Sequence, residues 1–143
     1  MKQPELSVSS SLWQVAALWQ RGVKKILDSI DVTPPQSIIL SSLLLLSKQK
    51  ESITQIDLSL HSKIDPMTTS TIIRTLERKG FIKRKEHDTD TRAKAVVLTS
   101  QGLKIARQAA KLIEKFDNQF FEALGSRSKT FNSSLLVLLK VRQ

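Results

Sequence analysis

The chain has 143 residues, of which 40% are hydrophobic and 25% charged, enough for one ordinary domain with its own core. It contains no cysteine, which excludes disulfides, thiolate metal sites and thiol-based redox sensing. Its 23 lysine and arginine residues outnumber its 13 aspartate and glutamate residues, and the net charge of +10 favours a polyanionic partner. A basic surface kept only for solubility is the alternative.

The N-terminal stretch MKQPELSVSSSLWQVAALWQ is unlike a signal peptide, because Ser, Gln and Glu interrupt its apolar residues. The longest apolar runs, 38–40 and 43–46, are too short to cross a bilayer. His61 and His87 lie far apart and lack the spacing of metal ligands. We therefore expect a cytoplasmic protein with no membrane partner, no metal and no cofactor.

Residues 8–30 predict an amphipathic helix. Its apolar side chains recur at steps of three and four along one stripe: Leu12, Val15, Ala16, Trp19, Val23, Ile26, Leu27 and Ile30. Trp13 and Leu18 lie off that stripe, so the helix has more apolar surface than one face needs. Core packing explains most of this surface, and the surplus indicates a partner helix from a second subunit.

A second helix is predicted from Pro34 to Ser47. Thr33 can be its N-cap, Pro34 takes the first helical position and Gln36 stands where a capping box needs it. Apolar residues lie on most sides of this helix, which predicts that it is buried at the centre of the domain.

Two further helices follow, joined by a short turn. The pattern Thr54-Gln55-Ile56-Asp57 is another capping box and opens a helix to about His61. The pair Asp65-Pro66 opens the next helix, which continues to Lys79 and stops at Gly80.

The second helix of this pair is expected to divide its side chains between core and solvent. Ile73 and Leu76, with Met67 or Ile72, are expected to face the core. The polar residues of its opening turns are expected to point mostly outward: Thr68, Thr69, Ser70, Thr71 and Arg74.

Phe81–Glu86 and Lys94–Leu98 predict two antiparallel strands joined by a charged turn. A strand sends neighbouring side chains to opposite faces, so its three consecutive cations cannot all lie in the core. We expect this strand and the start of the next to offer cations to a nucleic-acid backbone: Lys83, Arg84, Lys85 and Lys94.

The turn between the strands carries Asp90 and Arg92. An arginine at the tip of a projecting hairpin can enter the narrow minor groove, where the negative potential is strongest. Asp90, paired with Arg92, would hold the hairpin in shape. The alternative is an ordinary surface ion pair worth less than ~1 kcal/mol.

Two helices complete the chain. Thr99 is expected to cap a long helix over 101–124, which Gly125 ends. A last helix over 129–141 contains five consecutive apolar residues, 135–139. Helix exchange across a dimer explains this run better than a terminal core helix does.

Helix, turn, helix and β-hairpin in that order form a winged helix-turn-helix. The second helix of such a unit fits the major groove, where its N-terminal residues reach base edges. Short Ser and Thr side chains allow close approach, and Arg74 is the candidate for a longer contact to a base or phosphate. The alternative is that residues 68–71 are only solvated helix-opening residues.

The motifs of residues 33–125 resemble those of the MarR (multiple antibiotic resistance regulator) family of winged-helix transcription factors. Thr33-Pro34-Pro35-Gln36 is similar to its LTPxQ-type opening. The segment from Leu76 to Ile82 resembles its L-E-x-x-G-hydrophobic-hydrophobic junction. Asp90-Thr91-Arg92, followed by Leu98-Thr99 and Gly102, resembles its D-x-R…LTxxG wing signature.

This resemblance implies a mainly α fold with a small β-hairpin, in which N- and C-terminal helices form a dimerisation region. It implies one domain over 1–143, a DNA-binding lobe over 33–99, and dimerisation helices over 8–30 and 101–143. It also implies a homodimer on a pseudo-palindromic operator, with Arg92 in the minor groove and Asp90 as its structural partner.

The chain departs from the family in its reading helix. The family often has an arginine where Thr71 stands and an acidic residue where Arg74 stands, so operator identity does not carry over. Family members often sense small aromatic or lipophilic ligands. A pocket beside the buried helix, lined by Trp13 or Trp19, is a candidate site; plain core or dimer contacts are the alternative for both tryptophans.

The expected function is a sequence-specific DNA-binding transcriptional regulator, a dimeric repressor tuned by a small molecule. The alternative is a winged-helix protein-interaction or architectural module that selects no DNA sequence. An enzyme is not expected, because the sequence has no Gly-rich phosphate loop, nucleophile–histidine arrangement or metal-ligand spacing.

Overall fold

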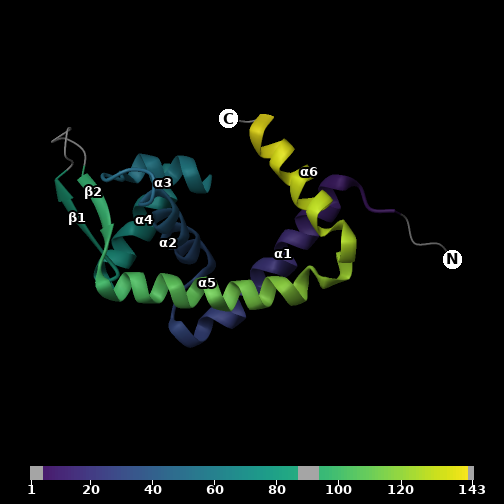
Figure 1. Ribbon diagram of the computed structural model, residues 1–143, viewed down its shortest axis with the longest axis horizontal. Coiled ribbons are helices and arrows are strands. Elements are labelled where there is room, and N and C mark those ends of the chain that lie inside the picture. The colour runs from purple at the N-terminus through teal and green to yellow at the C-terminus, as the bar shows by residue number, and fades with distance from the viewer. Residues whose placement is uncertain (1–4, 87–93, 142–143) are drawn as a thin grey trace.

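The computed structural model describes residues 5–86 and 94–141. They form helices and one two-stranded sheet, which lies at one end of the molecule (Figure 1). The elements are α1 (Val8–Leu27), η1 (Asp28–Ile30), α2 (Pro34–Leu46), α3 (Gln55–Ser62), α4 (Pro66–Arg78), β1 (Ile82–Glu86), β2 (Lys94–Leu98), α5 (Ser100–Phe120), η2 (Glu122–Arg127) and α6 (Ser128–Val141). The predicted mainly α fold with a small hairpin is confirmed.

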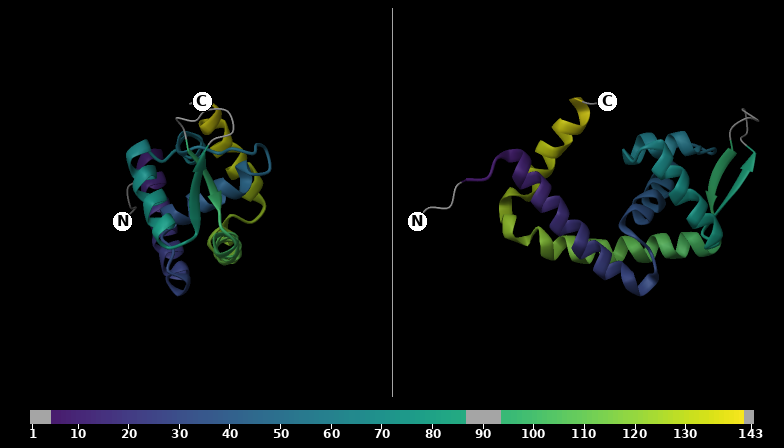
Figure 2. Two further views of the ribbon diagram at one scale, coloured as in Figure 1. Left: turned by 90° about the vertical axis from the view of Figure 1, so that its left-hand side faces the viewer. Right: turned by 180° about the vertical axis from the view of Figure 1, so that it is seen from behind.

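The molecule has two ends joined by one long helix. Helices α2, α3 and α4 and the hairpin form a lobe at one end, whereas the start of α1 and the start of α6 lie toward the other (Figure 1). Helix α5 runs beneath both, and the view from behind shows the same arrangement (Figure 2). The start of α5 therefore lies beside the hairpin, and its end leads into α6.

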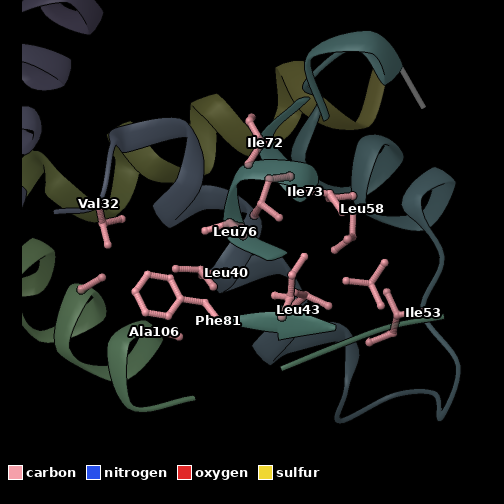
Figure 3. Packing of buried hydrophobic residues seen from close by; sticks show 14 of the residues in the cluster. Val32, Leu40, Leu43, Ile53, Leu58, Ile72, Ile73, Leu76, Phe81 and Ala106 are labelled. Carbon is pink, nitrogen blue, oxygen red and sulfur yellow. The ribbon is translucent and has the colours of Figure 1, made fainter. Parts of the chain in front are cut away.

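The lobe is held together by a core drawn from all of its elements. Figure 3 shows side chains of α2, α3 and α4 pointing toward one another, with Phe81 and Ala106 closing one side. Leu40, Leu58 and Leu76 are each fully buried. Because α4 packs on α2 through its apolar face, the opposite face of α4 remains at the surface.

The helix starts follow the capping chemistry expected from the sequence. Thr33 and Thr54 each form a capping box with the residue three positions on, Gln36 and Asp57. Asp65 caps α4, and the Thr99 hydroxyl accepts from the N–H of Gly102 at 3.0 Å. These bonds satisfy N–H groups that a helix start leaves without partners, which is why such local patterns are predictive.

Two predictions about the helices need correction. Helix α2 is not buried all round: Ile38 is 36% and Leu45 48% exposed, because α2 has packing partners on only part of its circumference. The long helix predicted to 124 ends at Phe120, and a 3₁₀ segment follows in which Gly125 has φ of 54°.

Apolar surface remains open on the two terminal helices. Helix α1 exposes Leu12, Trp13 and Leu18, and α6 exposes Leu136 to Leu139. Only Val23 and Leu27 of the predicted stripe of α1 are fully buried within the chain.

Within the described residues no single helix is long and apolar enough to span a membrane. The segment α1–η1 and helix α2 meet the criterion of length and composition only as a pair, which is bent by 79°.

A close backbone contact joins the lobe to α5. Gly80 ends the α4 region with φ of 81°, and the Thr99 hydroxyl donates to its carbonyl at 2.6 Å. The N–H of Thr99 donates to the carbonyl of Phe81 at 3.0 Å. Gly102 lies so near that a Cβ there would overlap this carbonyl oxygen and lie 2.7 Å from its carbon. Only glycine leaves room for this approach.

We expect Gly102→Ala to lower the free energy of unfolding by at least about 2 kcal/mol, because the added methyl group forces backbone to move. Urea unfolding at equal protein concentrations measures the change. Gln101→Ala, at the exposed neighbouring position, is the control and should shift the midpoint little. Equal midpoints for Gly102→Ala and the unmodified protein would contradict the prediction.

Candidate nucleic-acid interface

Helices α3 and α4 form a helix-turn-helix whose turn is held from both sides. Lys63 ends α3 in the left-handed conformation, with φ of 65°. The carbonyl of Ile64 then accepts from two hydroxyls, Ser59 Oγ at 2.7 Å and Thr69 Oγ1 at 3.2 Å. One of these bonds comes from each helix, so together they fix the angle between α3 and α4.

Thr69 lies inside this turn. Its side chain is fully buried, and its hydroxyl also lies 2.8 Å from the Asp65 carbonyl. The prediction that Thr69 points outward is therefore wrong, because the hydroxyl is used within the protein and covered by it. Thr69 shares a face with Ile72, Ile73 and Leu76, at spacings of three, four and seven residues. This spacing was the signal in the sequence that could have identified it.

The outer face of α4 carries a continuous stripe. Exposed side chains follow at steps of four, three and four residues: Met67, Thr71, Arg74 and Arg78. Met67 is 81% exposed, and Ile72 is the residue that completes the core face with Ile73 and Leu76. Thr68 is exposed beside the stripe, and Ser70 is half-buried. Of the predicted hydroxyl cluster, residues 68 and 71 are thus the accessible members.

Asp65 determines where α4 begins. Its carboxylate accepts from the backbone N–H of Thr68 at 2.9 Å. Hydrogen bonds from the Thr68 hydroxyl and N–H hold the pKa of the Asp65 carboxyl below its usual value, because they stabilise the ionised form. The cap is therefore charged at neutral pH, and its hydrogen bond fixes the position of the first turn of α4.

The hairpin places two lysines on its outer face. Strands β1 and β2 pair antiparallel, with Ile82 opposite Leu98 and Glu86 opposite Lys94. Lys83 and Lys85 are exposed, whereas Ile82 between α4 and β2 is buried. Lys94 is also exposed. The predicted alternation of faces along β1 is confirmed.

Arg84 does not share the face of these lysines. Its side chain is 28% exposed, and its Nε lies 3.9 Å from Oε1 of Glu77 on α4. The structure therefore separates Arg84 from the two neighbouring cations with which the sequence grouped it. Asp90 and Arg92 lie outside the described residues, so their predicted roles stay predictions.

Lys79 is directed inward, although it lies among the basic residues of this region. Its Nζ donates to the Asp31 carbonyl at 2.6 Å and to Gln36 Oε1 at 3.2 Å, and it lies 3.6 Å from Asp31 Oδ2. The bonds tie the end of α4 to the junction of α1 and α2. Nothing in the local sequence indicates them, because both partners lie more than 40 residues away along the chain.

A hollow of about 310 Å³ lies between the lobe and the α1–α5 pair. Its lining comes from four helices and comprises Trp19, Ser37, Ile38, Ser41, Ser42, His61, Ser62 and Ile113. Trp19 donates its Nε1–H to Asp117 at 2.7 Å, and His61 Nδ1 lies 2.8 Å from the Ser42 hydroxyl. Trp13 is 78% exposed and does not line this hollow, so of the two predicted tryptophans Trp19 is the one that the structure places here.

No cluster of three or more histidine or acidic side chains suited to a metal ion occurs within residues 5–86 and 94–141. The groups that α4 and the hairpin expose include hydroxyls, guanidinium groups and ammonium groups. Such groups suit a phosphate backbone and base edges.

Comparisons with known proteins agree with this arrangement. The family model described as "MarR family" matches residues 32–94. Over 137 residues the chain is 36% identical to YdcH of Bacillus subtilis (strain 168), an uncharacterized HTH-type transcriptional regulator, covering 96% of this chain and 92% of that protein.

Solved structures show the same fold at lower sequence identity. The S. aureus MepR–DNA complex has a TM-score of 0.83 at 22% identity and covers 97% of this chain and all of the MepR chain. CouR from Rhodococcus jostii RHA1, bound to p-coumaroyl-CoA, has a TM-score of 0.81 at 19% identity, covering 94% and 91% of the two chains.

The extent of the match to YdcH, the matching family model and the helix-turn-helix with its hairpin lead to one assignment. The chain belongs to the MarR family of winged helix-turn-helix transcriptional regulators.

Proposed function

We propose that the protein is a sequence-specific DNA-binding repressor that acts as a homodimer on a pseudo-palindromic operator. The observation that carries this proposal is the open outer stripe of α4 beside a hairpin whose exposed face bears Lys83 and Lys85. A helix of this kind fits the major groove, and cations on a hairpin can follow the adjacent backbone. The DNA complex of the similar MepR supports the same mode of use.

The terminal helices support the dimer. Helices α1 and α6, which lie outside the lobe (Figure 1), leave apolar side chains exposed. A second copy would cover them through an isologous contact and carry a second lobe. We therefore assign residues 8–30 and 101–143 to dimerisation and residues 33–99 to DNA binding. The two copies of α4 would then lie about 34 Å apart, in successive major grooves.

The hollow beside Trp19 is our candidate for a site that tunes DNA binding. It touches α2 and α3 of the lobe and also α1 and α5, so a molecule bound there can favour one placement of the lobe over another. The CoA ester bound to CouR supports a ligand for this chain as well. We further propose that the protein works in the cytoplasm and has no catalytic activity of its own.

Selection from random duplexes by the purified protein tests this function. We expect enrichment of a palindromic sequence, whose two halves reflect the two lobes. Affinity should fall steeply as salt rises, because Lys and Arg displace counterions condensed on DNA. Recovery of unenriched duplexes would support instead the protein-interaction or architectural module that the sequence also allows.

Arg92→Ala should weaken operator binding at least tenfold at fixed salt, because the variant loses the cation expected in the minor groove. A mobility-shift titration measures the affinity. Arg107→Ala, which removes an exposed arginine of α5, is the control with the same charge change. Unchanged affinity for Arg92→Ala would remove this residue from the binding mechanism.

Arg74→Ala should reduce binding to the selected operator more than binding to random duplex. A base contact contributes about 1 to 3 kcal/mol only where the base is correct. Arg78→Ala, one turn nearer the C-terminus of α4, should weaken both duplexes alike. Equal losses for Arg74→Ala would assign Arg74 to the phosphate backbone.

A further inference from the structure

Met67 occupies an unusual place for an apolar side chain. It is the second residue of α4, in the turn that would enter the major groove first, and 81% of it is exposed. The core does not use it, since Thr69, Ile72, Ile73 and Leu76 complete the buried face of α4. Helices α1 and α6, which we assign to dimerisation, lie outside the lobe that carries Met67 (Figure 1).

The first two turns of α4, which include Met67, carry no positive charge. The exposed or half-buried residues of the first two turns are Pro66, Met67, Thr68, Ser70 and Thr71. None of them carries a charge, and the first cation along the helix is Arg74. The strongest donors to guanine are therefore absent from this end of α4, where the helix approaches the bases most closely.

Thr71 strengthens the apolar character of the same stripe. It stands one turn after Met67, and its hydroxyl donates to the Met67 carbonyl at 3.3 Å. Thr75 repeats this pattern, donating to the Thr71 carbonyl at 3.1 Å. Because these hydroxyl protons are used within the helix, Thr71 offers a methyl group and acceptor lone pairs outward.

Among the four bases, only thymine presents a methyl group in the major groove. We propose that Met67 reads the 5-methyl group of a thymine in each operator half-site, with the Thr71 methyl beside it. Met67 is then a specificity-determining residue. The proposal rests on the DNA-binding function proposed above and identifies which base feature this end of α4 recognises.

Replacement of thymine by deoxyuridine tests the contact, because it removes the methyl group and leaves base pairing intact. Each thymine of the selected operator is replaced symmetrically in both half-sites, and the affinity of the unmodified protein is measured at fixed salt. We expect one position at which affinity falls about fourfold per half-site, or about sixteenfold in all, as for one apolar carbon leaving a buried contact.

The same replacement is then measured with Met67→Ala and with Met67→Gln, which keeps the side-chain length. Both variants should bind the thymine and the deoxyuridine operators equally at that position. Leu60→Ala, which truncates a residue of α3 that is 66% exposed, should still discriminate between them. Matching thermal midpoints for all variants are expected, because neither Met67 nor Leu60 is buried.

Several outcomes would overturn the proposal. One is that no deoxyuridine operator weakens binding of the unmodified protein. Another is that Met67→Ala and Met67→Gln still discriminate at the affected position, which would assign the methyl contact to another residue. In both cases the selected operator still binds, so the proposed DNA-binding function stands. Failure to select any operator would overturn that function and the role of Met67 together.

Discussion

The arrangement of the whole chain depends on the contact between Gly102 and the backbone of Phe81. Phe81 immediately precedes β1 and Gly102 lies in the first turn of α5, and no side chain separates the two backbones. Thr99 locks this crossing by donating to the carbonyls of Gly80 and Phe81 while capping α5. Backbone contacts at the end of the hairpin thus join the lobe to α5. Because the two backbones touch there, the lobe and α5 have little freedom to move relative to each other.

The contacts at Gly80 and two further sets of hydrogen bonds hold α4 at both ends. Its beginning is fixed by the Ile64 carbonyl, which receives hydroxyls from α3 and α4. Its end is fixed by Lys79, which reaches the junction of α1 and α2. A helix fastened in this way can leave its outer stripe free without losing its position. The same bonds connect the outer stripe of α4 to α1 and α5, so a ligand at the site proposed beside Trp19 would act on a continuous set of contacts.

The expectations from sequence succeeded where the physics is local. Caps at Thr33, Thr54, Asp65 and Thr99 need only residues three positions apart, and all four are present in the structure. They failed where neighbours from other elements decide which way a side chain faces. Thr69 looked like one more hydroxyl of an exposed cluster, yet α4 turns it toward the core.

The sequence by itself determined the order of the elements, the helix starts, the family motifs and the excess of positive charge. Each of these depends only on residues close together along the chain or on the overall composition. Only the tertiary structure decided which of these groups meet. Packing against α2 exposed Met67 and covered Ile72, and the placement of β1 turned Arg84 toward Glu77 of α4 and left Lys83 and Lys85 exposed. A side chain's direction depends on how its helix or strand is seated, and that seating depends on residues far away along the chain.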